Sequence, residues 1–128
     1  MIKILVVDDE YLVRYTLARI LRREGYEVAT AADGERGIAA YRNTVPDLVL
    51  ADMALSEPAG GATIRQMRRE QPTAKIIAIA HSWQINEADA RAMARRVDAD
   101  DVIFRPFDTE ELLDHLRVAL GGDAAAAV

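Results

Sequence analysis

The stretch Ile2-Lys3-Ile4-Leu5-Val6-Val7-Asp8-Asp9-Glu10 decides how the start of this chain folds. Its first six residues form a short apolar run rich in β-branched side chains, which predicts a strand buried on both faces of a sheet. A segment with apolar residues at helical spacing follows at residues 10–24. A buried strand followed at once by an amphipathic helix is the repeating unit of a parallel α/β fold.

This unit recurs along the chain. After the strand at residues 2–7, further strands are predicted at residues 26–30, 47–51, 75–80 and 102–104. After the first helix, further helices are predicted at residues 33–43, 61–70, 86–96 and 109–120. This alternation predicts an α/β protein with a flavodoxin-like (βα)₅ fold, in which a doubly wound parallel five-stranded sheet has the strand order 2-1-3-4-5.

Local signals mark the ends of several helices. Asn86 and Asp108 each precede an acidic residue by three positions, which is the spacing of a helix N-cap and its partner in the first turn. Gly25 follows the first helical pattern. It is predicted to end that helix, because glycine adopts the left-handed backbone conformation without strain.

Length and composition restrict the class of protein. The chain has 128 residues, no cysteine, 16 basic and 21 acidic side chains, and a net charge of −5. We expect one domain at residues 1–120 and a flexible tail or linker stub at residues 121–128. The lack of cysteine excludes disulfides and thiolate metal sites. No membrane span or signal peptide is recognisable, which predicts a cytoplasmic protein, and the acidic balance disfavours nucleic acid as this domain's partner.

Acidic side chains follow the first and third predicted strands. Asp8 and Asp9 come after the first strand, and Asp52 comes after the third. In the expected order these strands are neighbours about 4.8 Å apart, at the switch point where such sheets bind ligands. Close carboxylates repel one another unless a cation is present, and Mg²⁺ prefers oxygen ligands. Two acids alone are common at helix N-termini, but the third favours a metal site.

The order of several short motifs resembles the receiver domain of two-component response regulators. The resemblance covers about residues 2–120 and rests on Val6-Val7-Asp8-Asp9-Glu10, Asp52, Gly60, and Ala99-Asp100-Asp101-Val102-Ile103-Phe104-Arg105-Pro106-Phe107. It implies that Asp8, Asp9, Asp52 and the backbone carbonyl of Ala54 bind Mg²⁺ or Mn²⁺. It also implies that Asp52 accepts a phosphoryl group from a sensor histidine kinase or a phosphotransfer protein.

The same resemblance implies a signalling domain and not an enzyme, beyond self-phosphorylation from a donor and self-dephosphorylation. In many receivers the fourth helix, fifth strand and fifth helix form a partner or homodimer surface. Here these elements are predicted at residues 86–96, 102–104 and 109–120.

Several positions depart from the family pattern. Arg105 stands where the family usually has lysine; it keeps the positive charge that contacts the phosphoryl group, on a longer and planar side chain. The usual hydroxyl residue at the end of the fourth strand corresponds to Ala80 by strand pattern or to Ser82 by its spacing from Asp52. Val102 replaces the aromatic switch residue. The residues that read out phosphorylation are therefore altered, whereas the acids are retained.

Three further interpretations of the sequence stay open at this point or are disfavoured. His81, expected in the loop after the fourth strand together with Trp83, either contacts the phosphoryl group or belongs to a partly buried loop pair. The altered Ala80, Val102 and Arg105 also suit a degenerate receiver that binds partners independently of phosphorylation. A Mg²⁺-dependent phosphohydrolase is disfavoured, because such enzymes typically place their first acids as Asp-x-Asp, whereas Asp8 and Asp9 are adjacent.

Overall fold

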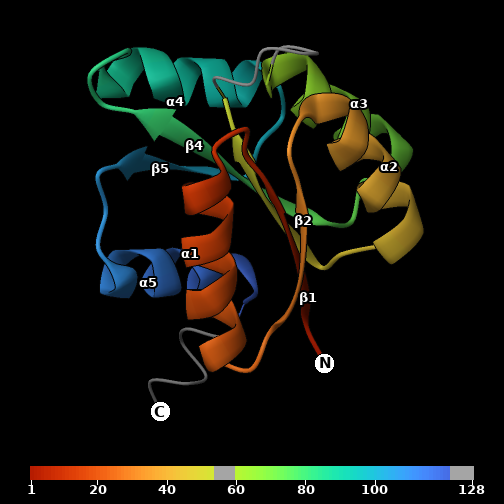
Figure 1. Ribbon diagram of the computed structural model, residues 1–128. Helices are drawn as coiled ribbons and strands as arrows, with labels where there is room; N and C mark the ends of the chain where they lie inside the picture. The colour runs from red at the N-terminus through yellow and green to blue at the C-terminus, as the bar shows by residue number, and fades with distance from the viewer. Residues whose placement is uncertain (54–59, 122–128) are drawn as a thin grey trace.

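The fold is that of a computed structural model, in which residues 1–53 and 60–121 are described. Five strands and five helices alternate along this part of the chain (Figure 1). The strands are β1 (Lys3–Val7), β2 (Glu27–Ala31), β3 (Leu48–Asp52), β4 (Lys75–His81) and β5 (Asp101–Arg105). The helices are α1 (Tyr11–Arg23), α2 (Gly34–Thr44), α3 (Gly60–Glu70), α4 (Glu87–Arg96) and α5 (Thr109–Ala119).

The strands form one parallel sheet in the order β2-β1-β3-β4-β5. The predicted flavodoxin-like (βα)₅ fold is therefore confirmed, including its strand order. Strands β1 and β3 are neighbours, and Val7 near the end of β1 pairs with Ala51 near the end of β3. The sheet thus brings together the ends of the two strands that acidic residues follow.

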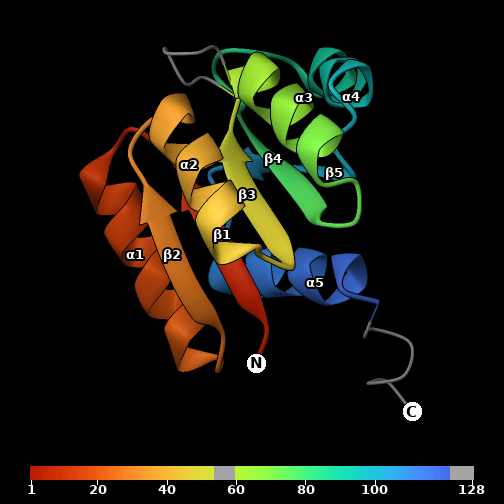
Figure 2. The same ribbon diagram turned by 90° about the vertical axis from the view of Figure 1, so that its right-hand side faces the viewer.

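The sheet separates two layers of helices. Helices α2, α3 and α4 cover one face, and α1 and α5 cover the other (Figures 1 and 2). Each layer has its own apolar cluster: Val7 and Val49 belong to the cluster under α2, α3 and α4, and Val6 and Leu50 belong to the cluster under α1 and α5. Because successive strand residues point to opposite faces, each strand supplies both clusters, which explains the continuous apolar runs in the sequence.

The predicted helix ends are confirmed where local chemistry sets them. The side chains of Asn86 and Asp108 accept the backbone N–H groups of Asp89 and Glu111, each at 2.8 Å. Gly25, which follows the C-cap residue Glu24 of α1, has a φ of 92°, in the left-handed region. These contacts form within one helical turn, so the sequence spacing was sufficient to predict them.

The ends of β4 and β5 correct the sequence-based expectation. The fifth strand covers Asp101–Arg105, not only residues 102–104, because it pairs with β4 along its whole length. His81, expected in a loop, is the last residue of β4 and pairs with Arg105. Both corrections concern residues whose strand conformation depends on the neighbouring strand.

Two further predictions concern membrane spans and the end of the chain. Within residues 1–53 and 60–121, no helix combines the length and the apolar character needed to cross a bilayer. Of the predicted tail at 121–128, only Gly121 falls within the described residues. The division into a domain at 1–120 and a tail therefore stays a prediction.

Candidate functional site

Two buried carboxylates lie where the strand order reverses. Asp52 is the last residue of β3, and Asp8 directly follows β1. Their exposed fractions are only 1% and 0%. The two are close enough for the charge of Asp52 to raise the pKa of Asp8, as the convergence of neighbouring strand ends predicts.

The surroundings of Asp8 oppose its ionisation. Burial is the largest cause that raises the pKa of Asp8 from 3.8 to about 6, and the charges of Asp52 and Asp9 add to the rise. The backbone N–H of Glu10, which donates to Oδ1 at 2.9 Å, and the charge of Arg105 act in the opposite direction. The other oxygen, Oδ2, is buried and has no hydrogen-bond partner within the described residues.

Three acids lie close enough together to hold a cation. Asp8, Asp9 and Glu10 each offer a carboxylate oxygen, and these atoms lie within 4.8 Å of one another. Asp9 and Glu10 are exposed, whereas Asp8 is buried, so the group forms an open, one-sided site of the kind that suits a partly hydrated Mg²⁺. The unsatisfied Oδ2 of Asp8 supports this fit. Ala54, the further ligand expected from the sequence, lies outside the described residues.

Glu10 is a member of this group that sequence reasoning did not propose as a ligand. It stands at the N-cap of α1, but its side chain makes no capping hydrogen bond. Its Oε1 lies 3.7 Å from Nη1 of Arg105. The sequence signal for Glu10 as a ligand was its place as the third acid in a row, but acids are also typical of the start of a helix.

Arg105 brings a positive charge to the same edge of the sheet. It ends β5, and its side chain is 23% exposed. Its Nη1 makes no hydrogen bond within the part of the chain that the structure describes, although it lies in ion-pair range of Glu10. Because its charge lowers the pKa of Asp8, Arg105 acts on the acid site and not only on its own surroundings.

The side chain that approaches Asp52 from β4 is that of His81. Its Nε2 lies 3.2 Å from Oδ1 of Asp52, and its exposed fraction is 5%. Its Nδ1 is buried without a hydrogen-bond partner among the described residues. The ring of Trp83 packs edge-on against the imidazole, with ring centroids 4.7 Å apart. The sequence predicted a residue near the site but not this contact, which depends on the register between β3 and β4.

The other two candidates lie in surroundings that differ from those of His81. Ala80 is buried in the cluster under α2, α3 and α4, and Ser82 is exposed in the turn that follows. Val102, at the predicted switch position, is buried in the same cluster as Ala80. The choice between Ala80 and Ser82 for the phosphoryl-contacting position stays a prediction.

Comparison with known proteins identifies the family. A family model described as the response regulator receiver domain matches residues 4–117. The probable transcriptional regulatory protein TcrX of Mycobacterium tuberculosis is 32% identical over 93% of this chain and 50% of its own length. The chain thus spans about half the length of that relative.

Two further similarities cover nearly the whole of the related chain. Protein PilH of Pseudomonas aeruginosa is 32% identical over 95% of this chain and 100% of its own length. The structure of the chemotaxis protein CheY4 of Vibrio cholerae matches with a TM-score of 0.86 at 26% identity, covering 93% of this chain and 98% of CheY4. With its (βα)₅ fold and its acids at the β1 and β3 ends, the chain belongs to the response regulator receiver domains of two-component systems.

Proposed function

We propose that this domain accepts a phosphoryl group on Asp52 and passes the signal on through its protein surface. The observation that carries the proposal is a pair of buried atoms of opposite charge at this edge: Oδ2 of Asp8 and Nη1 of Arg105 have no hydrogen-bond partner within the described residues. Leaving a buried polar atom without a hydrogen bond costs about 1–3 kcal/mol. A cation beside Asp8 and an anionic group beside Arg105 would satisfy both atoms.

Asp52 supplies the nucleophile in this proposal. One of its carboxylate oxygens attacks the phosphorus of a phosphohistidine, and a P–O bond forms as the P–N bond breaks. The electron pair of the broken bond stays on the imidazole nitrogen of the donor, which takes up a proton. The products are an acyl phosphate on Asp52 and an unmodified histidine. Arg105 pairs with a phosphoryl oxygen and offsets its negative charge.

The metal ligands that we propose are Asp8, Asp9 and Asp52, with Glu10 added by its place in the acidic group. The family pattern adds the backbone carbonyl of Ala54. Mg²⁺ or Mn²⁺ held by these oxygens supplies positive charge that offsets the repulsion between a carboxylate and a phosphoryl group. The buried and unsatisfied Oδ2 of Asp8 supports this assignment.

The partners follow from the family. We propose a sensor histidine kinase or a phosphotransfer protein of the cytoplasm as the phosphodonor, and no turnover beyond self-phosphorylation and self-dephosphorylation. We propose the surface of α4, β5 and α5 as the output or homodimer surface. The guanidinium of Arg91 on α4 lies 5.8 Å from the ring centroid of Phe104 on β5, and this contact between two of the three elements supports the proposal.

Phosphate uptake tests the proposed function. The chain is incubated with acetyl phosphate and Mg²⁺, and its intact mass is measured. We expect the mass of one phosphoryl group to be gained by the wild type and not by Asp52→Asn. Asp114→Asn on α5 is the matched control, because it makes the same chemical change at an exposed position, and it should gain the group. No uptake by the wild type would contradict the proposal and favour the phosphorylation-independent module.

A further inference from the structure

His81 occupies a position from which it can detect a change at Asp52. It is the last residue of β4, and its Nε2 lies 3.2 Å from Oδ1 of Asp52. The contact is buried, since the exposed fractions of the two residues are 5% and 1%. A buried hydrogen bond to a carboxylate is sensitive to the charge of its acceptor, because little water is present to screen it.

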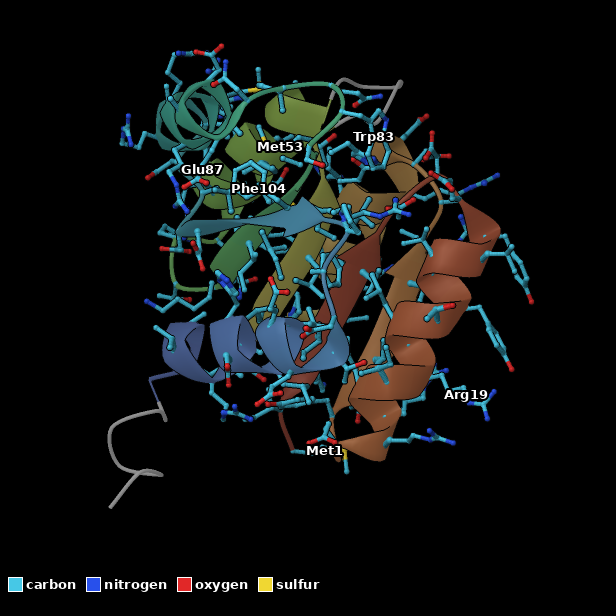
Figure 3. All side chains as sticks on the ribbon, turned by 90° about the vertical axis from the view of Figure 1, so that its left-hand side faces the viewer. Met1, Arg19, Met53, Trp83, Glu87 and Phe104 are labelled. Carbon is cyan, nitrogen blue, oxygen red and sulfur yellow. The ribbon has the colours of Figure 1, made fainter. Side chains whose placement is uncertain are left out.

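His81 is linked to the surface and to α4. The exposed ring of Trp83 packs edge-on against its imidazole, and Figure 3 shows Trp83 and Met53 at the end of the sheet where β3 and β4 finish. The carbonyl oxygen of His81 accepts the backbone N–H groups of Gln84 and Ile85, at 2.9 and 3.2 Å. This turn leads directly to Asn86, the N-cap of α4, so hydrogen bonds connect the backbone of His81 to the start of α4.

A pocket lies next to His81. A cavity of about 130 Å³ is lined by Met53, Ala80, His81, Gln84, Ile85 and Met93. The small side chain of Ala80 helps to leave this space open at the end of β4. A side chain with a single hydrogen-bonded contact and a pocket beside it can adopt a second arrangement when that contact is lost.

We propose that His81 senses the phosphorylation state of Asp52 and transmits it through Trp83 and the β4–α4 turn to α4. The proposal rests on Asp52 being the phosphoacceptor. In the unmodified protein, Nε2 of His81 holds the carboxylate of Asp52. When one carboxylate oxygen becomes part of an acyl phosphate, the other remains as a carbonyl oxygen without formal charge, and the negative charge lies on the phosphoryl oxygens. The imidazole then leaves Oδ1 for the adjacent pocket. Trp83 and the turn move with it.

This role matches the departures from the family pattern. Ala80 and Val102 lack the hydroxyl group and the aromatic ring that read out phosphorylation in the family, and both are buried in the cluster under α4. At the end of β4, His81 offers a hydrogen-bond donor, and Trp83 in the following turn offers an aromatic ring. A population shift needs a differential interaction between two states, and the contact with Asp52 supplies one.

The test uses the emission of Trp83, which is the only tryptophan in the chain. Wild type, His81→Ala and His115→Ala are treated with acetyl phosphate and Mg²⁺, and the emission and the intact mass are measured on the same samples. His115, the second of two histidines, pairs with Asp101 on the α5 side and serves as the matched control. We expect phosphorylation to change the emission of the wild type and of His115→Ala, and we expect His81→Ala to lose this change at equal phosphoryl content.

Each outcome decides between the two proposals. A phosphorylated His81→Ala with the full wild-type change, or a phosphorylated wild type without any change, overturns the role of His81 and leaves the proposed function intact. A wild type that gains no mass overturns the proposed function, and the role of His81 with it. If His81→Ala does not fold, His81→Gln carries the test: it keeps an N–H donor but has no ring for Trp83, so its emission should also fail to respond, and a full response overturns the proposal.

Discussion

At Asp8, burial and charge repulsion act together. Because its pKa rises from 3.8 to about 6 on folding, the folded protein holds a proton between these pH values that the unfolded chain has released. The free energy of unfolding therefore falls as the pH rises from 3.8 to about 6. The stabilisation is fully present below pH 3.8 and is lost once the pH exceeds about 6. In the absence of metal, Asp8 thus destabilises the fold at neutral pH.

The substitution Asp8→Asn tests the destabilisation that we assign to the ionised Asp8 side chain. The amide oxygen can still accept the N–H of Glu10, but the buried charge is gone, so we expect the variant to be more stable than the wild type at pH 7.5 in chelator. The gain should be on the order of 1–2 kcal/mol after allowance for partial solvation, and it should vanish near pH 4. Urea unfolding at the two pH values measures it. Equal gains at both values would contradict the assigned cause.

The same variant separates burial from metal binding. A ligand that binds only the folded state raises its stability, so millimolar Mg²⁺ should raise the melting temperature of the wild type. The melting temperature of Asp8→Asn should not respond, because this variant lacks the charged Oδ2, the carboxylate oxygen that has no hydrogen-bond partner in the described residues. Asp114→Asn, altered at an exposed site, should respond as the wild type does.

For single residues, the sequence predicted the acids but not all of their contacts. Asp8, Asp9 and Asp52 could be found because they directly follow apolar runs. The proximity of His81 to Asp52 could not, because it requires the register in which β4 extends one residue beyond the predicted end. Glu10 was not proposed as a candidate ligand for a different reason: an acid at a helix start is common without any metal.

Among the elements, α2 lies in close contact with β1, the strand that Asp8 follows. A Cβ atom placed on Gly37 of α2 would lie 2.9 Å from Cγ1 and 3.1 Å from Cγ2 of Val7. Glycine at this position lets the helix approach the end of β1. The position of Asp8, the next residue after Val7, therefore depends on this contact.

Gly37→Ala tests the contact. In an open helix, alanine would stabilise the protein by about 1 kcal/mol relative to glycine. Here we expect the free energy of unfolding to fall by about 1–3 kcal/mol, because the methyl group is forced against Val7. Denaturant unfolding gives the sign, and a more stable variant would show that β1 and α2 separate without cost.

Elements differ in how far local sequence determines them. The caps at Asn86 and Asp108 are formed by side chains that bond to backbone three residues away, and spacing alone predicted them. Strand β5 was expected to be shorter, because Asp101 and Arg105 are charged and break the apolar pattern. They join the strand because β4 offers partners for the full length of the ladder.

For the whole molecule, topology creates the site. Asp8, Asp52, His81 and Arg105 follow or end four different strands, and the order β2-β1-β3-β4-β5 brings those strand ends to one edge. The alternation of apolar runs and helical patterns was enough to predict this arrangement, since short right-handed crossovers leave few alternatives. The identity of the partner depends on surface complementarity, which no pattern in one chain contains.

The location of the phosphoryl group tests the central claim most directly. After treatment with acetyl phosphate and Mg²⁺, reduction with borohydride converts an acyl phosphate on aspartate into homoserine, and peptide mass spectrometry locates it. We expect homoserine at position 52 alone, and none when Mg²⁺ is chelated. Homoserine at another aspartate, or labelling that is independent of Mg²⁺, would contradict the assignment of Asp52 as the phosphoacceptor of a metal-dependent receiver.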